Sequence, residues 1–266
     1  MESMDFPLSE WLNLLVRWVH VFAGILWIGS TYYFTWLDRQ LGRAAAASER
    51  GVWMVHSGGF YLVEKQKNPS IDPGKLHWFR FEALTTWLSG LLLLGIVYYG
   101  GGMLVDEGSL GNGALVALGL GVIALGWFAY DLLWMTGIGL VPGAVICYAA
   151  LVALSFGLTQ VMSGRAAYIH IGSLMGSIMA LNVWVRILPA QKKLVAAVAS
   201  GAAPDPALAD RAKTRSKHNT FMVIPVVLIM ISNHFPVATY GSDRSWLVLA
   251  VLILVGFGAA KVLRER

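Results

Sequence analysis

Long runs of apolar residues constrain this chain more than any other feature of its sequence. The first run, from Arg17 to Asp38, holds about twenty mostly apolar residues, enough at 1.5 Å per residue to cross a ~30 Å hydrocarbon layer. Of the 266 residues, 57% are hydrophobic and 13% are charged, whereas soluble domains carry about 25% charged residues. Because the runs are long and do not alternate as barrel strands do, we predict an all-α integral membrane protein.

We predict one polytopic domain over residues 1–266, built as a bundle of about seven transmembrane helices. The predicted spans are approximately residues 11–37, 80–100, 113–135, 140–162, 166–189, 219–237 and 245–263. Two polar loops, 38–79 and 190–218, connect spans one to two and five to six. Within the first loop, Trp53–Glu64 mixes apolar and polar residues, which predicts a short helix broken at Gly58–Gly59 that lies on the membrane or packs under the bundle.

The positions of lysine and arginine predict the orientation of the bundle. With seven spans, seventeen of these residues fall on the side that holds both long loops and the C-terminus, against two on the other side. This bias places the N-terminus outside and the C-terminus in the cytoplasm. It also explains the basic composition, so we predict no nucleic-acid partner. The seventeen are Arg39, Arg43, Arg50, Lys65, Lys67, Lys75, Arg80, Arg186, Lys192, Lys193, Arg211, Lys213, Arg215, Lys217, Lys261, Arg264 and Arg266; the two are Arg165 and Arg244.

Three histidines fall at similar depth near the outer side. His20 lies in the first span, His170 near the start of the fifth and His234 near the end of the sixth, ~5–10 Å below the outer edge. An ionisable group at this depth usually faces protein, water or a ligand. Two imidazoles from different helices suit a b-type haem, and Gly24, one turn from His20, would let a porphyrin approach. A three-histidine copper, iron or zinc site is the alternative.

A second set of polar residues lies near the inner side. His77, Arg80, Glu82 and Thr86 open the second span, and Glu82, Thr86 and Ser89 share one helical face. The other members are Asp131, Asn182, Arg186, His218 and Asn219, from spans three, five and six. A carboxylate with histidine, amide and guanidinium groups suits a planar anion and supplies proton acceptors. A structural ion pair of Glu82 with Arg80 or a lysine is the alternative.

Cysteine and glycine content adds two constraints. Cys147 is the one cysteine, which excludes an internal disulfide and a covalently attached CxxCH haem. Gly172, Gly176 and the glycines of the third span suit either internal helix packing or the interface of a homo-oligomer.

Five blocks of this sequence resemble, in the same order, the membrane domain of the bacterial membrane-bound, cytochrome c-linked urate oxidases, also called urate hydroxylases. The blocks are RWVHVFAGILWIGSTYYFTWLD, HSGGFYLVEK, LHWFRFEALTTWLSG, HIGSLMGSIMALNVWVRILPAQKK and KHNTFMVIPVVLIMISNHFP. The first block is also similar to the first helix of bacterial membrane protoporphyrinogen oxidases and copper-resistance membrane proteins. The protoporphyrinogen oxidase resemblance implies that His20 binds haem.

The resemblance implies a multi-pass protein of the bacterial inner membrane that oxidises urate to 5-hydroxyisourate. Water supplies the oxygen, and electrons leave to cytochrome c rather than to dioxygen. From the positions of the outer histidines we expect haem b, one or two per chain, to carry these electrons. In the family, a cytochrome c domain follows the membrane domain, whereas this chain ends at Arg266 with no CxxCH. We therefore expect a separate cytochrome c or a quinone as the electron acceptor.

Under this interpretation the outer histidines and the inner polar residues have different roles. Glu82, His77 and His218 are the candidate catalytic residues, and Arg80, Thr86, Asn182, Arg186 and Asn219 the candidate urate-binding residues. His20 with His170 or His234 would bind the haem. Two other classes remain open: a haem-dependent oxidase of another planar substrate, such as a porphyrinogen, and a non-catalytic electron-transfer or metal-handling subunit. A purine transporter is disfavoured because the sequence shows no internal repeat.

Overall fold

A computed structural model of the chain describes residues 8–66, 69–105 and 110–265, and it is mostly helical. The α-helices are α1 (Leu8–Ala46), α2 (Phe81–Leu93), α3 (Asn112–Met135), α4 (Leu140–Thr159), α5 (Gly164–Leu181), α6 (Leu188–Ala199), α7 (Pro206–Ser232) and α8 (Ser245–Glu265). A short 3₁₀ turn, η1 (Pro73–Lys75), precedes α2. Two π-helical segments, η2 (Leu94–Tyr99) and η3 (Asn182–Ile187), continue α2 and α5.

Among the described residues, six helices are long and apolar enough to cross a membrane. They are Leu8–Ala46, Phe81–Tyr99, Asn112–Met135, Leu140–Thr159, Gly164–Ala199 and Ser245–Glu265. They identify a multi-pass membrane protein. The predicted seventh span corresponds to the second half of α7. That helix falls outside the set of six, since its first half carries the basic residues Arg211, Lys213, Arg215 and Lys217.

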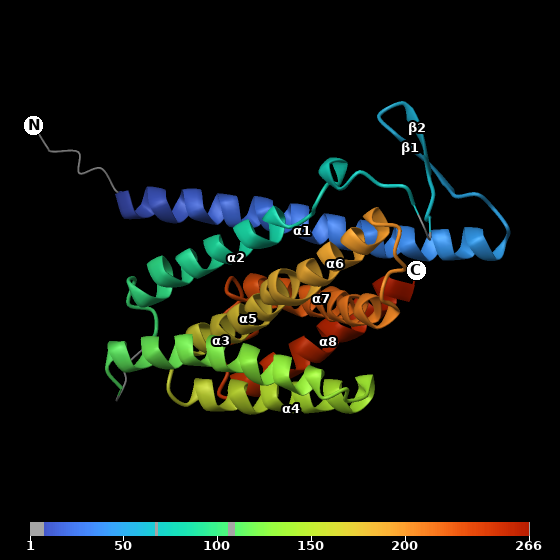
Figure 1. The fold of residues 1–266 in the computed structure, drawn as a ribbon. Coiled ribbons are helices and arrows are strands. Elements are labelled where there is room, and N and C mark those ends of the chain that lie inside the picture. Colours follow the sequence, from blue (N-terminus) through green and yellow to red (C-terminus); the bar gives the residue numbers. More distant parts are fainter. Residues whose placement is uncertain (1–7, 67–68, 106–109, 266) are drawn as a thin grey trace, which may run out of the picture.

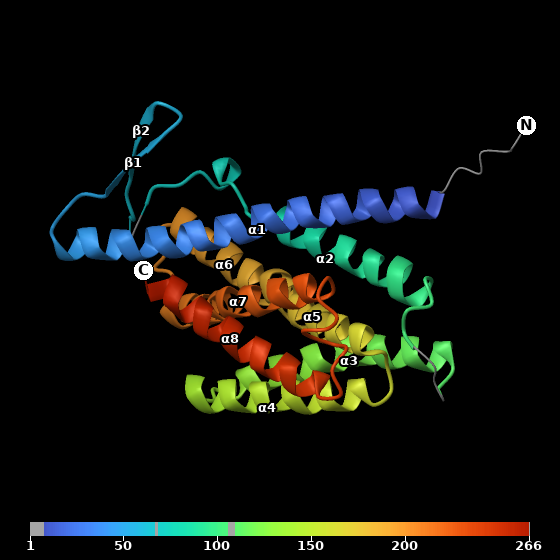
Figure 2. The same cartoon turned by 180° about the vertical axis from the view of Figure 1, so that it is seen from behind.

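The helices surround α5, which is the most buried element. Twelve of its 18 residues are buried, whereas α1 buries three of 39. Figures 1 and 2 show α1 and α2 side by side along one flank, with α5 and α7 running through the middle and α4 on the far side. Tyr32 ties α1 to the bundle by donating a hydrogen bond to the carbonyl of Thr220 on α7 (3.0 Å). The apolar side chains that α1 leaves exposed suit contact with lipid.

The segment between α1 and α2 differs from the prediction. Trp53–Glu64 forms a β-hairpin instead of a helix: β1 (Val52–His56) pairs antiparallel with β2 (Gly59–Val63), and α1 continues to Ala46, into the predicted loop. Ser57 and Gly58 connect the strands with positive φ angles of 49° and 76°, the conformation that two-residue hairpin turns require. Valine and aromatic residues on both sides of this turn favour strands over a helix. The hairpin is the exception to the predicted all-α fold (Figure 1).

The predicted loop 190–218 is also largely helical. The fifth span continues through η3 and α6 to Ala199, and α7 begins at Pro206, where Asp205 caps the helix by accepting a hydrogen bond from the Ala207 N–H (2.9 Å). Residues 200–205 alone connect the two helices. The predicted span 219–237 ends earlier, at Ser232, because Asn233 to Tyr240 form a series of turns. The early start of α7 places Arg215 on the same helix as His218.

Candidate functional site

Tyr130 of α3 is the centre of a buried polar network that joins α3, η3 and α7. Its hydroxyl shares a hydrogen bond with Nδ1 of His218 (2.8 Å) and accepts one from Nδ2 of Asn182 (3.0 Å). Nδ2 of Asn182 also donates to Oδ1 of Asn219 (3.0 Å), and Nδ2 of Asn219 donates to the carbonyl of Met179 (2.9 Å). The sequence predicted Asn182, His218 and Asn219 as site residues, and the structure brings these three together.

Asp131, next to Tyr130, binds two arginines from different helices. Its Oδ1 accepts hydrogen bonds from Nε of Arg186 (2.9 Å) and Nη2 of Arg215 (2.8 Å), and its Oδ2 contacts Nη2 of Arg186. One carboxylate therefore faces two guanidinium groups, which leaves one positive charge uncompensated. The Arg215 guanidinium also lies over the Tyr130 ring, 5.0 Å from its centroid. This arrangement places a net positive charge beside the network.

Several atoms of the network are buried without a hydrogen-bond partner in the described part of the chain. They are Oδ1 of Asn182, Nε2 of His218 and Nη1 of Arg215. The three residues are less than one-tenth exposed. Buried polar groups in native proteins are nearly always satisfied by protein, water or ligand. The aromatic ring of Trp134 covers one side of His218 at 4.2 Å between ring centroids, which gives the site an apolar wall.

The predicted residues of the second span lie at the start of α2 and form a separate group. His77 is exposed and packs edge-on against Phe79 at 4.5 Å between ring centroids. Arg80 lies over the ring of Phe81, and Thr86 donates to the carbonyl of Glu82 (2.7 Å). Nε of Arg80 and Oε2 of Glu82 are buried and have no partner among the described residues. No described hydrogen bond or ion pair connects this group to the network around Tyr130.

His20 faces α2 and is held in one orientation. Its Nδ1 lies 2.9 Å from the carbonyl of Thr86 and 3.1 Å from Oγ of Ser89. Because a carbonyl only accepts, Nδ1 carries the proton, and Nε2 keeps the lone pair that a metal ligand needs. The ring lies against Gly90, where a Cβ would approach Cε1 to 3.0 Å. An open apolar groove of about 360 Å³ runs between α1 and α2 beside it, lined by Val16, Val19 and Ser89 among others.

The other two predicted haem ligands lie elsewhere. His170 is fully buried: its Nδ1 bonds the carbonyl of Ala166 (2.8 Å) and its Nε2 the hydroxyl of Tyr99 (3.1 Å). His234 is exposed in the turns after α7. Over the ranges the structure describes, no three His, Cys, Asp or Glu side chains come close enough to hold a metal ion, so the three-histidine alternative is not supported. His20 keeps one ring nitrogen free beside the helices, whereas both ring nitrogens of His170 are bonded. The exposed ring of His234 forms no hydrogen bond within the described residues.

The glycines named from the sequence make internal contacts or none. Gly24 faces Thr86 of α2, where its Cβ would lie 3.8 Å from Cγ2, so it faces a neighbouring helix. Gly172 packs against Ile229 of α7 (3.1 Å), while Gly176 has no atom within 4 Å of its Cβ position. In the third span, Gly119 is pressed against His170 and Gly126 against Leu174. Gly113 and Gly121 of that span, like Gly176, have no atom within 4 Å of their Cβ positions, and the other positions serve packing within the chain.

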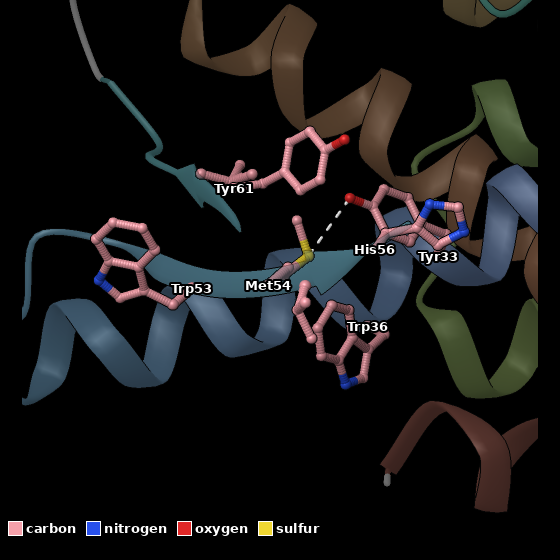
Figure 3. A pocket seen from close by; sticks show the side chains of 8 residues that line it. Tyr33, Trp36, Trp53, Met54, His56 and Tyr61 are labelled. Atoms are coloured by element: carbon pink, nitrogen blue, oxygen red, sulfur yellow. Dashed lines mark hydrogen bonds between the residues drawn. The ribbon is translucent and has the colours of Figure 1, made fainter. Parts of the chain in front are cut away.

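A groove of about 600 Å³ lies between α1 and the hairpin (Figure 3). Aromatic side chains dominate its lining, and the hydroxyl of Tyr33 contacts the sulfur of Met54 at 3.6 Å. His56, at one end, bonds the adjacent Ser57 hydroxyl (3.0 Å). The groove is open, has little polar lining and contains no charged side chain. It therefore suits an apolar surface better than an anion.

Sequence reasoning missed Tyr130, Trp134 and the role of Arg215. Tyr130 and Trp134 are four residues apart, next to Asp131, so the sequence already places them on one helical face. Arg215, His218 and Asn219 share a helical face, but that spacing was hidden because residues 190–218 were assigned to a loop.

Comparison with curated proteins gave no match, and comparison with solved structures gave none either. A family model described as "Urate oxidase N-terminal" matches residues 7–266, which is nearly the whole chain. Together with the six apolar helices, this match shows that the chain belongs to the urate oxidase N-terminal family, a result that confirms the resemblance seen in its sequence.

Proposed function

We propose that this protein oxidises urate to 5-hydroxyisourate in a membrane. The reaction adds the oxygen of one water molecule to C5 of urate and releases two protons and two electrons. A cytochrome c or a quinone accepts the electrons. The family supports the substrate. The main observation in support is the buried network with one uncompensated positive charge. Urate is a planar anion at neutral pH, so this charge would attract it.

The network supplies the contacts that such an anion needs. Arg215 and Arg186 provide the positive charge, and Asp131 holds both guanidinium groups in place. Asn182, Asn219 and His218 provide hydrogen-bonding groups in a buried setting, where they are stronger than in water. Trp134, whose ring packs beside His218, provides an aromatic surface next to these groups.

Glu82 remains the best candidate to accept the protons that urate and water release. Its Oε2 is buried without a partner in the described chain, as expected for a carboxylate that meets a proton donor only when substrate is bound. His77 is exposed and is a weaker candidate. This role requires the start of α2 to approach the network during turnover.

His20 would hold a haem b through Nε2, because its Nδ1–H is bonded to the Thr86 carbonyl as the outer nitrogen of a ligating histidine usually is. Bound there, the haem would supply one-electron steps between urate and the external acceptor. Ser89 and Gly90 position the His20 ring on its α2 side.

We further propose that the end of the bundle with the network faces the bacterial cytoplasm. The basic residues of α6, the first half of α7 and the end of α8 gather there, as the positive-inside bias requires. Two of the seventeen, Lys67 and Arg266, lie outside the described residues.

An optical spectrum of the detergent-purified protein tests this proposal. It is recorded as isolated, after urate and after dithionite. We expect Soret and α bands that sharpen with urate alone. Haem reduced only by dithionite would point to another substrate or an electron-carrier subunit. A colourless protein would remove the haem assignment.

A further inference from the structure

The direction of each hydrogen bond around Tyr130 can be derived from one backbone anchor, the carbonyl of Met179. The Met179 carbonyl can only accept, so the side chain of Asn219 must direct its NH₂ group there. Oδ1 of Asn219 then accepts from Asn182, which directs the NH₂ group of Asn182 into the network. The second hydrogen of that NH₂ group goes to the oxygen of Tyr130. As a result, Oδ1 of Asn182 is left as a buried acceptor without a donor.

The same series of hydrogen bonds determines which ring nitrogen of His218 carries the proton. Tyr130 accepts from Asn182, and within the described residues Nδ1 of His218 is the one acceptor its own O–H meets. Tyr130 therefore donates to Nδ1, which must be unprotonated. In a neutral imidazole the proton is then on Nε2. His218 thus presents a buried N–H donor, and Nη1 of Arg215 is a second.

We propose that Asn182 Oδ1, His218 Nε2–H and Arg215 Nη1 form one recognition set for a planar ring that carries an N–H group beside a carbonyl. The ring N–H donates to Asn182, and carbonyl oxygens accept from His218 and Arg215. Cyclic ureides such as urate have this pattern. His218 thereby positions the substrate and does not remove its proton. The inference rests on the proposed function only in placing urate at this site.

All three groups belong to side chains that contact Tyr130. Asn182 and His218 both bond its hydroxyl, and Arg215 lies over its ring. Each comes from an anchored side chain: Asn182 by Asn219, His218 by Tyr130 and Arg215 by Asp131. A set held in this way discriminates between ligands, because a ligand lacking one group leaves a buried partner unpaired.

The first test compares urate with its four mono-N-methyl derivatives on the dithionite-reduced holoenzyme, where no turnover occurs. Equilibrium dialysis gives each dissociation constant. We expect at least one derivative to bind about tenfold or more weakly than urate, since its methyl group replaces the N–H that Asn182 accepts. We expect another to bind as urate does. Equal affinity for all five compounds would overturn the recognition set. Binding of none of them would also overturn it if xanthine shows no Tyr130-dependent binding.

The second test determines directly which ring nitrogen of His218 carries the proton. Solid-state ¹⁵N NMR of histidine-labelled protein should show one imidazole with bare Nδ1 and protonated Nε2 that disappears in His218→Gln. In Tyr130→Phe this tautomer should no longer dominate, and the discrimination among methylurates should fall. Tyr168→Phe is the matched control, because its buried hydroxyl bonds the Ser245 carbonyl (2.7 Å) outside the network. A protonated Nδ1 in the native protein contradicts the inference.

The two proposals fail in different ways. If urate reduces the protein but urate and its four methyl derivatives have the same dissociation constant, the recognition set is wrong and the oxidase assignment stands. If urate neither binds nor reduces the protein, while xanthine binds in a Tyr130-dependent manner, the recognition set stands and the urate assignment is wrong.

Discussion

The three outer histidines and the polar residues around Tyr130 were predicted by the same reasoning, since each set has matched depth on different helices. In the structure, His20, His170 and His234 lie in three unrelated environments: against α2, inside the bundle and in an exposed turn. Asn182, His218 and Asn219 instead belong to one hydrogen-bonded network. Matched depth therefore does not establish contact. The inner residues meet because α5, η3 and α7 pack directly against each other, whereas α1 is held mainly by α2.

Replacing His20 by alanine is the strongest test of whether the three outer histidines act separately. If haem depends on this residue alone, His20→Ala should lose the Soret band completely, because both ring nitrogens of His170 are already bonded and His234 lies in an exposed turn. His170→Ala should retain the band, and so should His234→Ala. The measurement is an absorbance spectrum of protein purified in the same detergent. A band lost in His170→Ala as well would mean that the outer histidines do form one site.

Replacing Glu82 by glutamine asks whether α2 serves the network. General bases contribute about 10²–10⁴-fold to rates, so Glu82→Gln should lower kcat by a factor in this range and leave the haem spectrum unchanged. Thr85→Val is a control on the same helix, since Thr85 is exposed. Full activity of Glu82→Gln would mean that Glu82 of α2 takes no part in the reaction.

Replacing Asp131 by asparagine breaks the charged part of the network. It leaves two arginines without their carboxylate, and one of them, Arg215, is buried. Removing one partner of a buried ion pair costs about 3–5 kcal/mol of stability. Thermal unfolding in detergent should show a clearly lower Tm. Asp38→Asn, whose ion pair with Lys65 is half exposed, should cost about 0–1 kcal/mol. Equal shifts in both variants would mean that the network is no more important than a surface pair.

Replacing Gly119 by alanine adds a methyl group to the surroundings of His170. The new Cβ would lie 2.8 Å from the Tyr99 hydroxyl and collide with Nε2 of His170. Overpacking of this kind costs about 1–3 kcal/mol, and turnover of urate should be unaffected because the network lies elsewhere. Gly121→Ala is the matched control on the same helix, since nothing lies within 4 Å of its Cβ position. A large loss of activity in Gly119→Ala alone would connect His170 to catalysis.

The sequence predicted most of the helices because hydrophobic length is a local property. It failed where local signals competed. The hairpin at Val52–Val63 carries a two-residue Ser-Gly turn between β-branched and aromatic runs, a signal that a weakly amphipathic pattern obscured. The start of α7 carries Asp205-Pro206, a helix-start signal that the basic residues after it obscured.

For the candidate site, the sequence supplied residue types but few of their partners. Asn182 and His218 were found because polar groups are rare in membrane helices. Tyr130 was missed because tyrosine is common near membrane surfaces and gives no signal by itself. The separation of Glu82 from the network depends on how α2 packs against α1, which no single segment of sequence specifies.

The π-helical segment η3 has a consequence for comparing this chain with its relatives. A π-helical turn holds one residue more than the α-helical turn around it, so η3 acts as a single-residue insertion within the continuous helix Gly164–Ala199. Deleting one residue between Asn182 and Arg186 would restore a regular helix and rotate every later side chain by about 100°, carrying Arg186 away from Asp131. A relative that lacks this residue should align well on both sides and yet be unable to build the same charged pair. The length of this one turn is therefore a simple marker for dividing the family.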